Sequence, residues 1–226
     1  MQAVIFAAGK GNRLKPFTDT EPKVLLPISG IPLLMRSLST LPDEITEIII
    51  VVNHFKEKVM NYVYAHPPRQ KIIFATQPKL NGTWSALIAA QPFIKEGPFL
   101  VLPGDDLFSK KDLEKCISHI PSFGVSKKIM PAMYRKVLID ENHVLGLARQ
   151  QETDYAQPIL VATGAYCLTK EVFGFEGVTL IDGEIGLPHT LLAHAKDYPL
   201  YAIEMPGWHP VNTFQDKTDA EKAYPA

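Results

Sequence analysis

Residues 3–28, AVIFAAGKGNRLKPFTDTEPKVLLPI, join an apolar segment to a glycine-rich basic loop in this 226-residue chain. The apolar run at 4–6 is continuous, as expected of a parallel β-strand that is buried on both faces. The small residues Ala7, Ala8, Gly9 and Gly11 remove the side chains that would keep a ligand away from the backbone, so peptide N–H groups there can face an anion. Arg13 and Lys23 add positive charge. A buried strand that leads into such a loop predicts a phosphate-binding site at the end of the strand.

Two common nucleotide-binding motifs do not fit this loop. The dinucleotide-binding fingerprint requires a third glycine where this chain has Leu14, and an acidic residue where the next apolar run ends in Asn53. A Walker A loop requires G-x-x-x-x-G-K-[ST], which GKGNRLKP at 9–16 does not supply. An ordinary turn is the alternative for a lone G-x-G, and the ordered basic and proline residues through Lys23 argue against it.

Apolar runs alternate with amphipathic segments along the first half of the chain. Strands are predicted at 45–53, 71–77 and 99–106, and helices at 55–66 and 83–94. Short strands joined by helices favour an α/β fold with a doubly wound, mostly parallel central sheet flanked by helices. Ligands of such sheets bind beyond the carboxyl ends of the strands. The second half is less regular, and three apolar segments there are expected to return to the sheet.

Composition sets the limits of the interpretation. The hydrophobic content of 46% suits one large core, and we expect a single domain over 1–226. The net charge of -1 gives no general attraction to nucleic acid, and no run approaches the roughly 18–20 apolar residues of a membrane span. The first residues lack the regions of a signal peptide, so a cytoplasmic location is expected.

The residues of the loop resemble the signature of sugar-1-phosphate nucleotidyltransferases, L-A-A-G-x-G-[ST]-R-[LM]-x-P-[LF]-T followed by P-K-x-[LM]-x-P. This chain reads F-A-A-G-K-G-N-R-L-K-P-F-T and then P-K-V-L-L-P, with Asn12 as the departure. The resemblance implies a Rossmann-like, GT-A-type enzyme that joins an NTP to a sugar 1-phosphate and releases pyrophosphate, with Mg²⁺ as cofactor. It also implies a nucleotide-binding half at 1–110 and a sugar-binding half at 111–226.

The resemblance assigns roles within the loop. It implies that Ala8, Gly9 and Gly11 embrace the nucleotide, while Arg13 contacts its phosphates and activates the leaving pyrophosphate. Lys23 is implied to contact phosphate as well. In such a reaction the sugar phosphate attacks the α-phosphorus in line, and catalysis comes from positioning and charge neutralisation rather than from a protein nucleophile.

The segment ATQPKLNGTWSALIAA, residues 75–90, is the second informative stretch. Gln77 ends a predicted strand, and Gly82 with Thr83 opens a predicted helix. A carboxamide can donate and accept, so Gln77 could read the adjacent carbonyl and imide N–H of uracil or thymine. The alternative is a simple turn at Gln-Pro and Asn-Gly. The resemblance implies that Gln77, Gly82 and Thr83 contact the nucleotide and favours UTP or dTTP, although Trp84 replaces a small residue.

Asp105 and its neighbour Asp106 follow the apolar strand FLVL. A carboxylate at this end of the sheet suits Mg²⁺, which prefers one or two carboxylates together with substrate phosphate. A turn or a helix cap would explain Gly-Asp-Asp equally well. The resemblance implies that Asp105 binds the metal and takes part in catalysis, with the Asp106 side chain pointing elsewhere.

The resemblance weakens toward the end of the chain. Where the family usually supplies a second metal ligand from W-x-D-[VI]-[GN]-T, this chain reads WHPVNT and has Pro210 in place of the aspartate. Asn212 lies two residues on and could offer an amide oxygen to the metal from the same side of an extended segment. Among sugar-binding positions, Gly164 fits T-G-x-Y and Glu184 fits a following G-E. Arg149 could only approximately replace the lysine of E-K-P.

Three interpretations therefore stay open. The first is an active nucleotidyltransferase whose partners are an NTP and a sugar 1-phosphate. The second is a weak or silent relative that binds a nucleotide or sugar nucleotide as a regulatory partner, suggested by Pro210 and the lost lysine. The third is a phosphocholine cytidylyltransferase, which would need an aromatic cage around the quaternary ammonium, for which Trp84, Tyr166 and Trp208 are the candidates.

Overall fold

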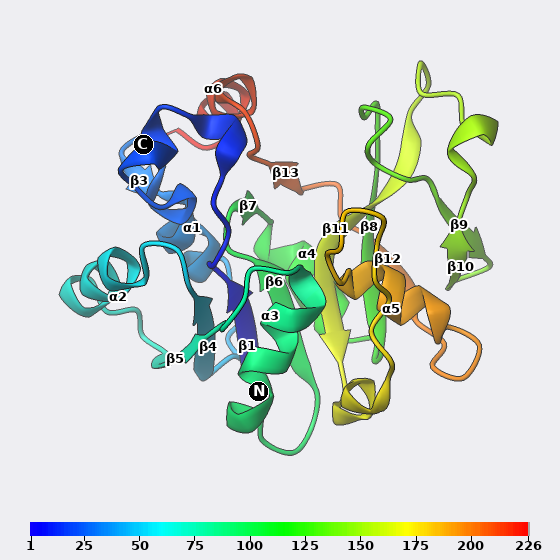
Figure 1. Ribbon diagram of the computed structural model, residues 1–226, viewed down its shortest axis with the longest axis horizontal. Coiled ribbons are helices and arrows are strands. Elements are labelled where there is room, and N and C mark those ends of the chain that lie inside the picture. Colours follow the sequence, from blue (N-terminus) through cyan, green and yellow to red (C-terminus); the bar gives the residue numbers. More distant parts are fainter. Residues whose placement is uncertain (226) are drawn as a thin grey trace.

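A nine-stranded sheet forms the centre of the computed structural model, which describes residues 1–225 (Figure 1). Its strands lie in the order β5 (Lys71–Thr76), β4 (Glu47–Val52), β1 (Gln2–Phe6), β6 (Phe99–Pro103), β11 (Ile159–Leu168), β8 (Ser122–Lys128), β12 (Tyr201–Glu204), β10 (His143–Leu147) and β9 (Val137–Asp140). β11 and β10 run antiparallel to their neighbours, and the other strands share one direction. The predicted mostly parallel sheet is confirmed.

Helices cover both faces of this sheet (Figure 1). One face packs against α1 (Leu33–Ser39), α2 (Lys56–Ala65) and α4 (Lys110–Ile117), and the other against α3 (Thr83–Ala90) and α5 (Leu187–Ala193). Successive side chains of β4 point to opposite faces of the sheet, so Ile48 and Ile50 pack in the first core while Ile49 packs in the second. Helices on both faces are therefore needed to cover these apolar side chains. A strand covered on both faces reads as an uninterrupted apolar run, which is how the sequence predicted it.

A third, smaller core lies beside the sheet. It packs α6 (Phe214–Ala223) against β2 (Pro27–Ile28), which pairs with β3 (Ile31–Pro32). A second short pair joins β13 (His209–Pro210) to β7 (Asp106–Leu107), with Pro210 opposite Asp106. This pairing brings the end of the chain to the loop after β6.

The predicted elements and the observed ones differ mainly at their ends. The strand predicted at 45–53 is β4, and the helix predicted at 55–66 is α2. The helix predicted at 83–94 stops at Ala90 and continues as a short 3-10 turn, since Pro92 cannot continue the hydrogen-bond ladder. The sheet takes strands from both 1–110 and 111–226. Within the described residues, every helix is too short or too polar to cross a membrane.

Candidate functional site

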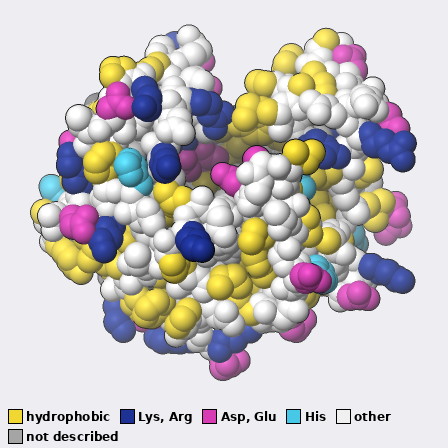
Figure 2. Space-filling model, in the orientation of Figure 1, with side chains coloured by type: hydrophobic (Ala, Val, Ile, Leu, Met, Phe, Trp, Pro, Cys, Tyr) yellow, Lys and Arg dark blue, Asp and Glu magenta, His cyan; other side chains and the backbone are white. Residues whose placement is uncertain are grey.

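Two adjoining cavities open at the carboxyl ends of β1 and β6, where open α/β sheets bind ligands. Figure 2 shows the hollow between two lobes, with acidic side chains inside it. The basic cavity, of about 270 Å³, is lined by Phe6, Gly9, Gly11, Asn12, Arg13, Lys23, Val24, Asp105 and Asn212. The aromatic cavity, of about 280 Å³, is lined by Phe6, Thr83, Pro103, Asp105, Asp106, Tyr134, Ala162, Thr163, Gly164, Tyr166, Leu187, Pro188, Trp208 and Asn212.

The loop after β1 is shaped by its backbone and by a buried apolar anchor. Gly11 has φ +64°, a left-handed conformation that favours glycine, and its carbonyl accepts a hydrogen bond from Thr18 Oγ1 at 2.9 Å. Leu14 is fully buried in the small core beside α6. Arg13, between these two points, is exposed and lines the basic cavity. Ala8 is buried behind the loop and lines neither cavity.

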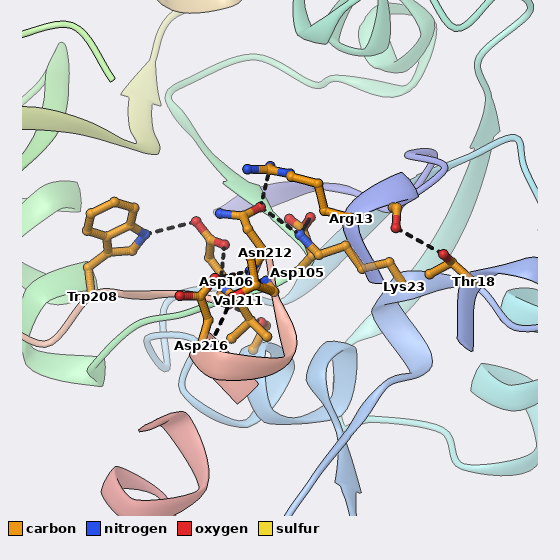
Figure 3. Close-up of polar contacts among 12 residues, drawn as sticks. Arg13, Thr18, Lys23, Asp105, Asp106, Trp208, Val211, Asn212 and Asp216 are labelled. Atoms are coloured by element: carbon orange, nitrogen blue, oxygen red, sulfur yellow. Dashed lines mark hydrogen bonds and ion pairs between the residues drawn. The ribbon is translucent and has the colours of Figure 1, made fainter. Parts of the chain in front are cut away.

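Four side chains meet where the two cavities join (Figure 3). Lys23 Nζ lies 2.5 Å from Asp105 Oδ2 and 3.0 Å from Asn212 Oδ1. Arg13 Nη2 donates to the same Asn212 oxygen at 2.8 Å. Only 7% of the Lys23 side chain is exposed, so its charge needs these oxygens. Two oxygen atoms from distant segments of the chain therefore converge on one ammonium group.

The start of α6 holds Asn212 in place. The backbone N–H groups of Asn212 and Thr213 each donate to Asp216 Oδ2 at 2.8 Å, and Thr213 Oγ1 accepts from the Asp216 N–H at 3.1 Å. This capping box fixes the backbone on which Asn212 stands. Its side chain then reaches the junction of the cavities, where Nδ2 donates to Tyr134 Oη at 3.0 Å.

Asp106 is nearly buried and bonds to a different set of partners from Asp105. Its Oδ2 accepts from Trp208 Nε1 at 2.9 Å, and its Oδ1 accepts from the Val211 N–H at 3.3 Å (Figure 3). Burial, followed by the neighbouring Asp105 carboxylate, raises the pKa of Asp106 to about 7. These bonds and the β7–β13 pairing hold the segment before Asn212 against the loop that carries Asp105.

The turn at Gln77 is joined to the segment before α5. Gln77 Nε2 donates to the Gly82 carbonyl at 3.1 Å, so part of this amide already holds the turn. Gly82 has φ +108°, and a Cβ there would lie 2.3 Å from the Ile185 carbonyl oxygen. Thr83 Oγ1 accepts from the Leu187 N–H at 2.9 Å, and Thr83 lines the aromatic cavity. Gln77 is buried and lines neither cavity.

Comparison with known proteins identifies the family. The family model described as Nucleotidyl transferase matches residues 2–222, nearly the whole chain. The chain belongs to this nucleotidyl transferase family. The family predicted from the loop at 3–28 is thereby confirmed.

Curated relatives are similar to this nucleotidyl transferase over most or half of its length. The bifunctional protein GlmU of Methanocaldococcus jannaschii is 31% identical over 226 residues, which cover 98% of this chain and 54% of GlmU. The UTP–glucose-1-phosphate uridylyltransferase AglF of Haloferax volcanii is 34% identical over 110 residues, 48% of this chain and 45% of AglF. The chain spans about half the length of the GlmU relatives that it matches.

Solved structures share the fold of this nucleotidyl transferase. An inositol-1-phosphate CTP transferase from T. maritima superposes with a TM-score of 0.78 at 21% identity, over 100% of this chain and 97% of that one. A UDP-glucose pyrophosphorylase complexed with UDP-glucose gives a TM-score of 0.80 at 20% identity, over 99% and 97% of the two chains. At these identities the likeness establishes the fold alone.

The predicted sugar-binding residues of the nucleotidyl transferase do not all reach the cavities. Gly164 lines the aromatic cavity, next to Pro103. The Arg149 side chain is 81% exposed, its Nη1 lies 3.5 Å from Glu152 Oε1, and it lines neither cavity. Glu184 is exposed and also lines neither cavity. The geometry thus brings Gly164 to the site and leaves Arg149 and Glu184 outside its walls.

The three aromatic residues considered for a choline cage do not converge. Trp84 is buried under Gly177, where a Cβ would lie 2.6 Å from the Trp84 ring, and it does not line the cavity. Tyr166 and Trp208 do line it. The Trp208 ring already carries the Lys128 ammonium 5.3 Å from its centroid.

Sequence reasoning missed Tyr134, which lines the aromatic cavity, and Lys128, which lines neither cavity but contacts Trp208 of the aromatic cavity. Lys128, the last residue of β8, donates to the Trp208 carbonyl as well as lying over its ring. Burial lowers the pKa of Lys128, and the nearby Asp106 opposes this shift. Neither residue belongs to a local motif. The only signal for Lys128 was a lysine pair at the end of a strand, and Tyr134 carried none.

The donors at the junction fit a magnesium ion. Asp105 Oδ2 and Asn212 Oδ1 already point at one cation, the Lys23 ammonium, and both are the oxygen ligands that Mg²⁺ prefers. Within residues 1–225 no group of three His, Cys, Asp or Glu side chains is arranged to hold a metal. A metal at the junction would therefore take the rest of its shell from phosphate and water. Pro210, at the position of the usual aspartate, pairs with Asp106 and offers no side-chain ligand.

Proposed function

We propose that this chain is a sugar-1-phosphate nucleotidyltransferase that takes UTP or dTTP and a sugar 1-phosphate and produces a sugar nucleotide and pyrophosphate. The observation that carries the proposal is the meeting of Arg13, Lys23, Asp105 and Asn212 between the two cavities. The basic cavity offers cations to a triphosphate, while the aromatic cavity is lined mainly by apolar side chains around Thr83, Thr163 and Gly164.

Each residue has a task in this reaction. Gly9 leaves room for the nucleotide phosphates, whereas Gly11 lets the loop pack closely against Thr18 and Lys23, with Ala8 supporting the loop from behind. Arg13 and Lys23 neutralise the charge that develops on the leaving pyrophosphate. Bound Mg²⁺, held by Asp105, Asn212 and phosphate, would supply further neutralisation at the reacting phosphates.

The acceptor lies on the other side of the junction in this proposal. Gly164, Thr83 and Tyr134 form walls that would hold a sugar 1-phosphate in line with the α-phosphorus. Lys128 lies over the ring of Trp208, which lines the aromatic cavity, and replaces Arg149 as our candidate for the acceptor phosphate. Glu184 would reach sugar hydroxyls only if its loop moved toward the cavity.

The choice of base rests on Gln77. Its Nε2 is occupied by Gly82, which leaves Oε1 to accept from the imide N–H of uracil or thymine. Similar proteins include the UTP–glucose-1-phosphate uridylyltransferase AglF and an inositol-1-phosphate CTP transferase, whose names specify pyrimidine nucleotides. We propose UTP or dTTP because cytosine lacks the imide N–H.

One panel of assays tests the proposal. Pyrophosphate release is measured for each of ATP, GTP, CTP, UTP and dTTP with several sugar 1-phosphates and with phosphocholine, in Mg²⁺ and in EDTA. We expect UTP or dTTP to exceed the other nucleotides by about tenfold, or about 1.4 kcal/mol, only with a sugar 1-phosphate and Mg²⁺. Gln77→Ala should remove the preference for UTP or dTTP. Gln91 is an exposed glutamine at the end of α3, so Gln91→Ala is the control and should keep that preference.

Other results would change the assignment. Equal use of all five nucleotides would show that Gln77 holds only the turn. Release with phosphocholine alone would favour the cytidylyltransferase. Nucleotide binding that is unchanged in EDTA, without pyrophosphate release from any pair, would identify a silent binding protein instead of an enzyme.

A further inference from the structure

The amide of Asn212 has two chemically different ends, and the structure places each against a matching partner. Its Oδ1 accepts from Lys23 Nζ at 3.0 Å and from Arg13 Nη2 at 2.8 Å (Figure 3). Its Nδ2 donates to Tyr134 Oη at 3.0 Å. Lysine and arginine can only donate, so the carbonyl oxygen must be the end that faces them.

The orientation of this amide matters for a metal site. A carboxylate offers an oxygen whichever way it turns, whereas an amide turned by 180° would present an NH₂ group to the metal. With Pro210 where the family usually has aspartate, this chain relies on Asn212 for the second protein oxygen. It therefore needs a group that holds the amide with its oxygen toward the junction.

The two cations cannot be that group during turnover. Arg13 and Lys23 line the basic cavity, where the substrate phosphates would draw their hydrogen bonds away from Asn212. The capping box holds the Asn212 backbone and leaves the amide free to rotate. Tyr134 lies on the aromatic side, and its N–H donates to the Pro131 carbonyl at 2.9 Å within its own turn.

We propose that Tyr134 is a positioning residue whose hydroxyl holds Asn212 Nδ2 and thereby keeps Oδ1 directed at Mg²⁺. This inference rests on the proposed metal site of the nucleotidyltransferase. It assigns to Tyr134 a task that an aspartate at the metal site would not require, so the tyrosine hydroxyl and the asparagine form one functional pair.

A double-mutant cycle tests the pair by direct metal binding. Calorimetry measures Mg²⁺ affinity in the presence of α,β-methylene-UTP for the wild type, Tyr134→Phe, Asn212→Asp and the double variant. Tyr134→Phe should weaken Mg²⁺ binding about tenfold, as expected for loss of a partner that orients a metal ligand. In the Asn212→Asp background, Tyr134→Phe should leave Mg²⁺ affinity unchanged, because both ends of a carboxylate carry an oxygen that can bind the metal.

Two controls accompany the cycle. Tyr198→Phe removes the hydroxyl of a buried tyrosine that lines neither cavity and accepts from the Thr169 N–H at 2.9 Å, and it should leave Mg²⁺ affinity unchanged. Binding of the analogue in EDTA should be the same for Tyr134→Phe and the wild type. If Asn212→Asp fails to fold, the side-chain ¹⁵NH₂ signals of Asn212 provide a second measurement, and Tyr134→Phe should shift them.

Unchanged Mg²⁺ affinity in Tyr134→Phe would overturn the inference, as would an equal loss in both backgrounds or unshifted ¹⁵NH₂ signals. If the wild type releases pyrophosphate and binds Mg²⁺ normally while these results are negative, only the role of Tyr134 fails. If the wild type binds no Mg²⁺ in the presence of the analogue, the proposed metal site fails, and the inference fails with it.

Discussion

Gly9 and Gly82 both lie in the region of the site, and each position requires a glycine for a different physical reason. A Cβ at Gly9 would meet nothing within 4 Å and would project where the basic cavity is open. A Cβ at Gly82 would collide with the backbone of Ile185, and φ is +108° there. The first glycine leaves space for a ligand, and the second permits the chain itself to pack.

This difference predicts opposite outcomes for one substitution. Gly9→Ala should keep the melting temperature of the wild type and weaken UTP binding, because the methyl group enters only the cavity. Gly82→Ala should lower the free energy of unfolding by about 2–3 kcal/mol, since strain and a backbone clash add together. Thermal denaturation and nucleotide titration of both variants provide the check. Equal UTP affinity in Gly9→Ala and the wild type would contradict the role given to the loop.

Arg13 is the cleanest residue at which to test phosphate contact. Its side chain is exposed, so Arg13→Ala should fold normally while kcat falls at least about a hundredfold, equivalent to about 2.7 kcal/mol of transition-state stabilisation. Lys15→Ala, in the same loop but paired with Asp19, is the control and should keep its turnover. Lys23 is less suitable, because its removal would leave Asp105 without its partner. Normal kcat in Arg13→Ala would remove this assignment.

Three strands of the sheet are tied together at one carboxylate. Glu47, the first residue of β4, accepts from Gln2 Nε2 of β1 at 2.5 Å. Its Oε2 lies 3.0 Å from Lys95 Nζ and 3.2 Å from Lys71 Nζ at the start of β5. The hydrogen bond from Lys95, with smaller contributions from Lys71 and Gln2, lowers the pKa of Glu47 to about 2. This nearly buried carboxylate joins the amino ends of the strands, far along the sheet from the site.

The lowered pKa predicts a pH-dependent loss of stability in Glu47→Gln. A carboxylate whose pKa is about 2 in the folded state and 4.5 otherwise stabilises the fold above pH 4.5 and loses that contribution as the pH falls toward 2. The variant should therefore be less stable by about 1 kcal/mol at pH 7 and approach the wild type near pH 2. Urea unfolding across this range measures the difference. Asp43→Asn is the control, because it removes an exposed ion pair with Arg69 and should have a smaller effect on stability. If the difference in stability between Glu47→Gln and the wild type did not change with pH, the role given to Glu47 would be wrong.

At the scale of the molecule, a hollow lies across the carboxyl ends of the strands of the nine-stranded sheet. β11 pairs with β6 from the first half and with β8 from the second, so the ladder continues beneath the cavities. Across the hollow, Arg13 bonds to Asn212 near the end of the chain. The basic cavity and the aromatic cavity thus rest on one continuous sheet, which would support both proposed substrates.

A shared sheet predicts cooperative unfolding. Circular dichroism and tryptophan fluorescence should give coincident denaturation curves, because Trp84 of α3 packs in the core on one face of the sheet and Trp208 packs in the core on the other face. UTP with Mg²⁺ should shift both curves together, by an amount set by ligand concentration over its dissociation constant. Two separated transitions would show that 1–110 and 111–226 unfold as independent units.

The sequence alone determined the features that depend on short-range patterns. The uninterrupted apolar run at 4–6 marked a doubly covered strand, and the ordered residues from Gly9 to Lys23 marked the family. Asp105 was predicted because it directly follows a buried strand, and the ends of parallel strands meet at one edge. Asn212 was reached by counting two residues along an extended segment from Pro210. These features can be recognised in the sequence because each depends on residues that are close together in the chain.

Only the tertiary structure decided what surrounds these residues. The β7–β13 pairing and the Asp106 carboxylate bring Asn212 to Lys23, although no local pattern links these positions. Tyr134 reaches Asn212 through a hydrogen bond between segments that are distant in the chain, while Arg149, expected at the sugar site, lies exposed beside Glu152. The physical reason is that a hydrogen-bond partner is selected by distance in space, and chain folding sets that distance independently of residue type.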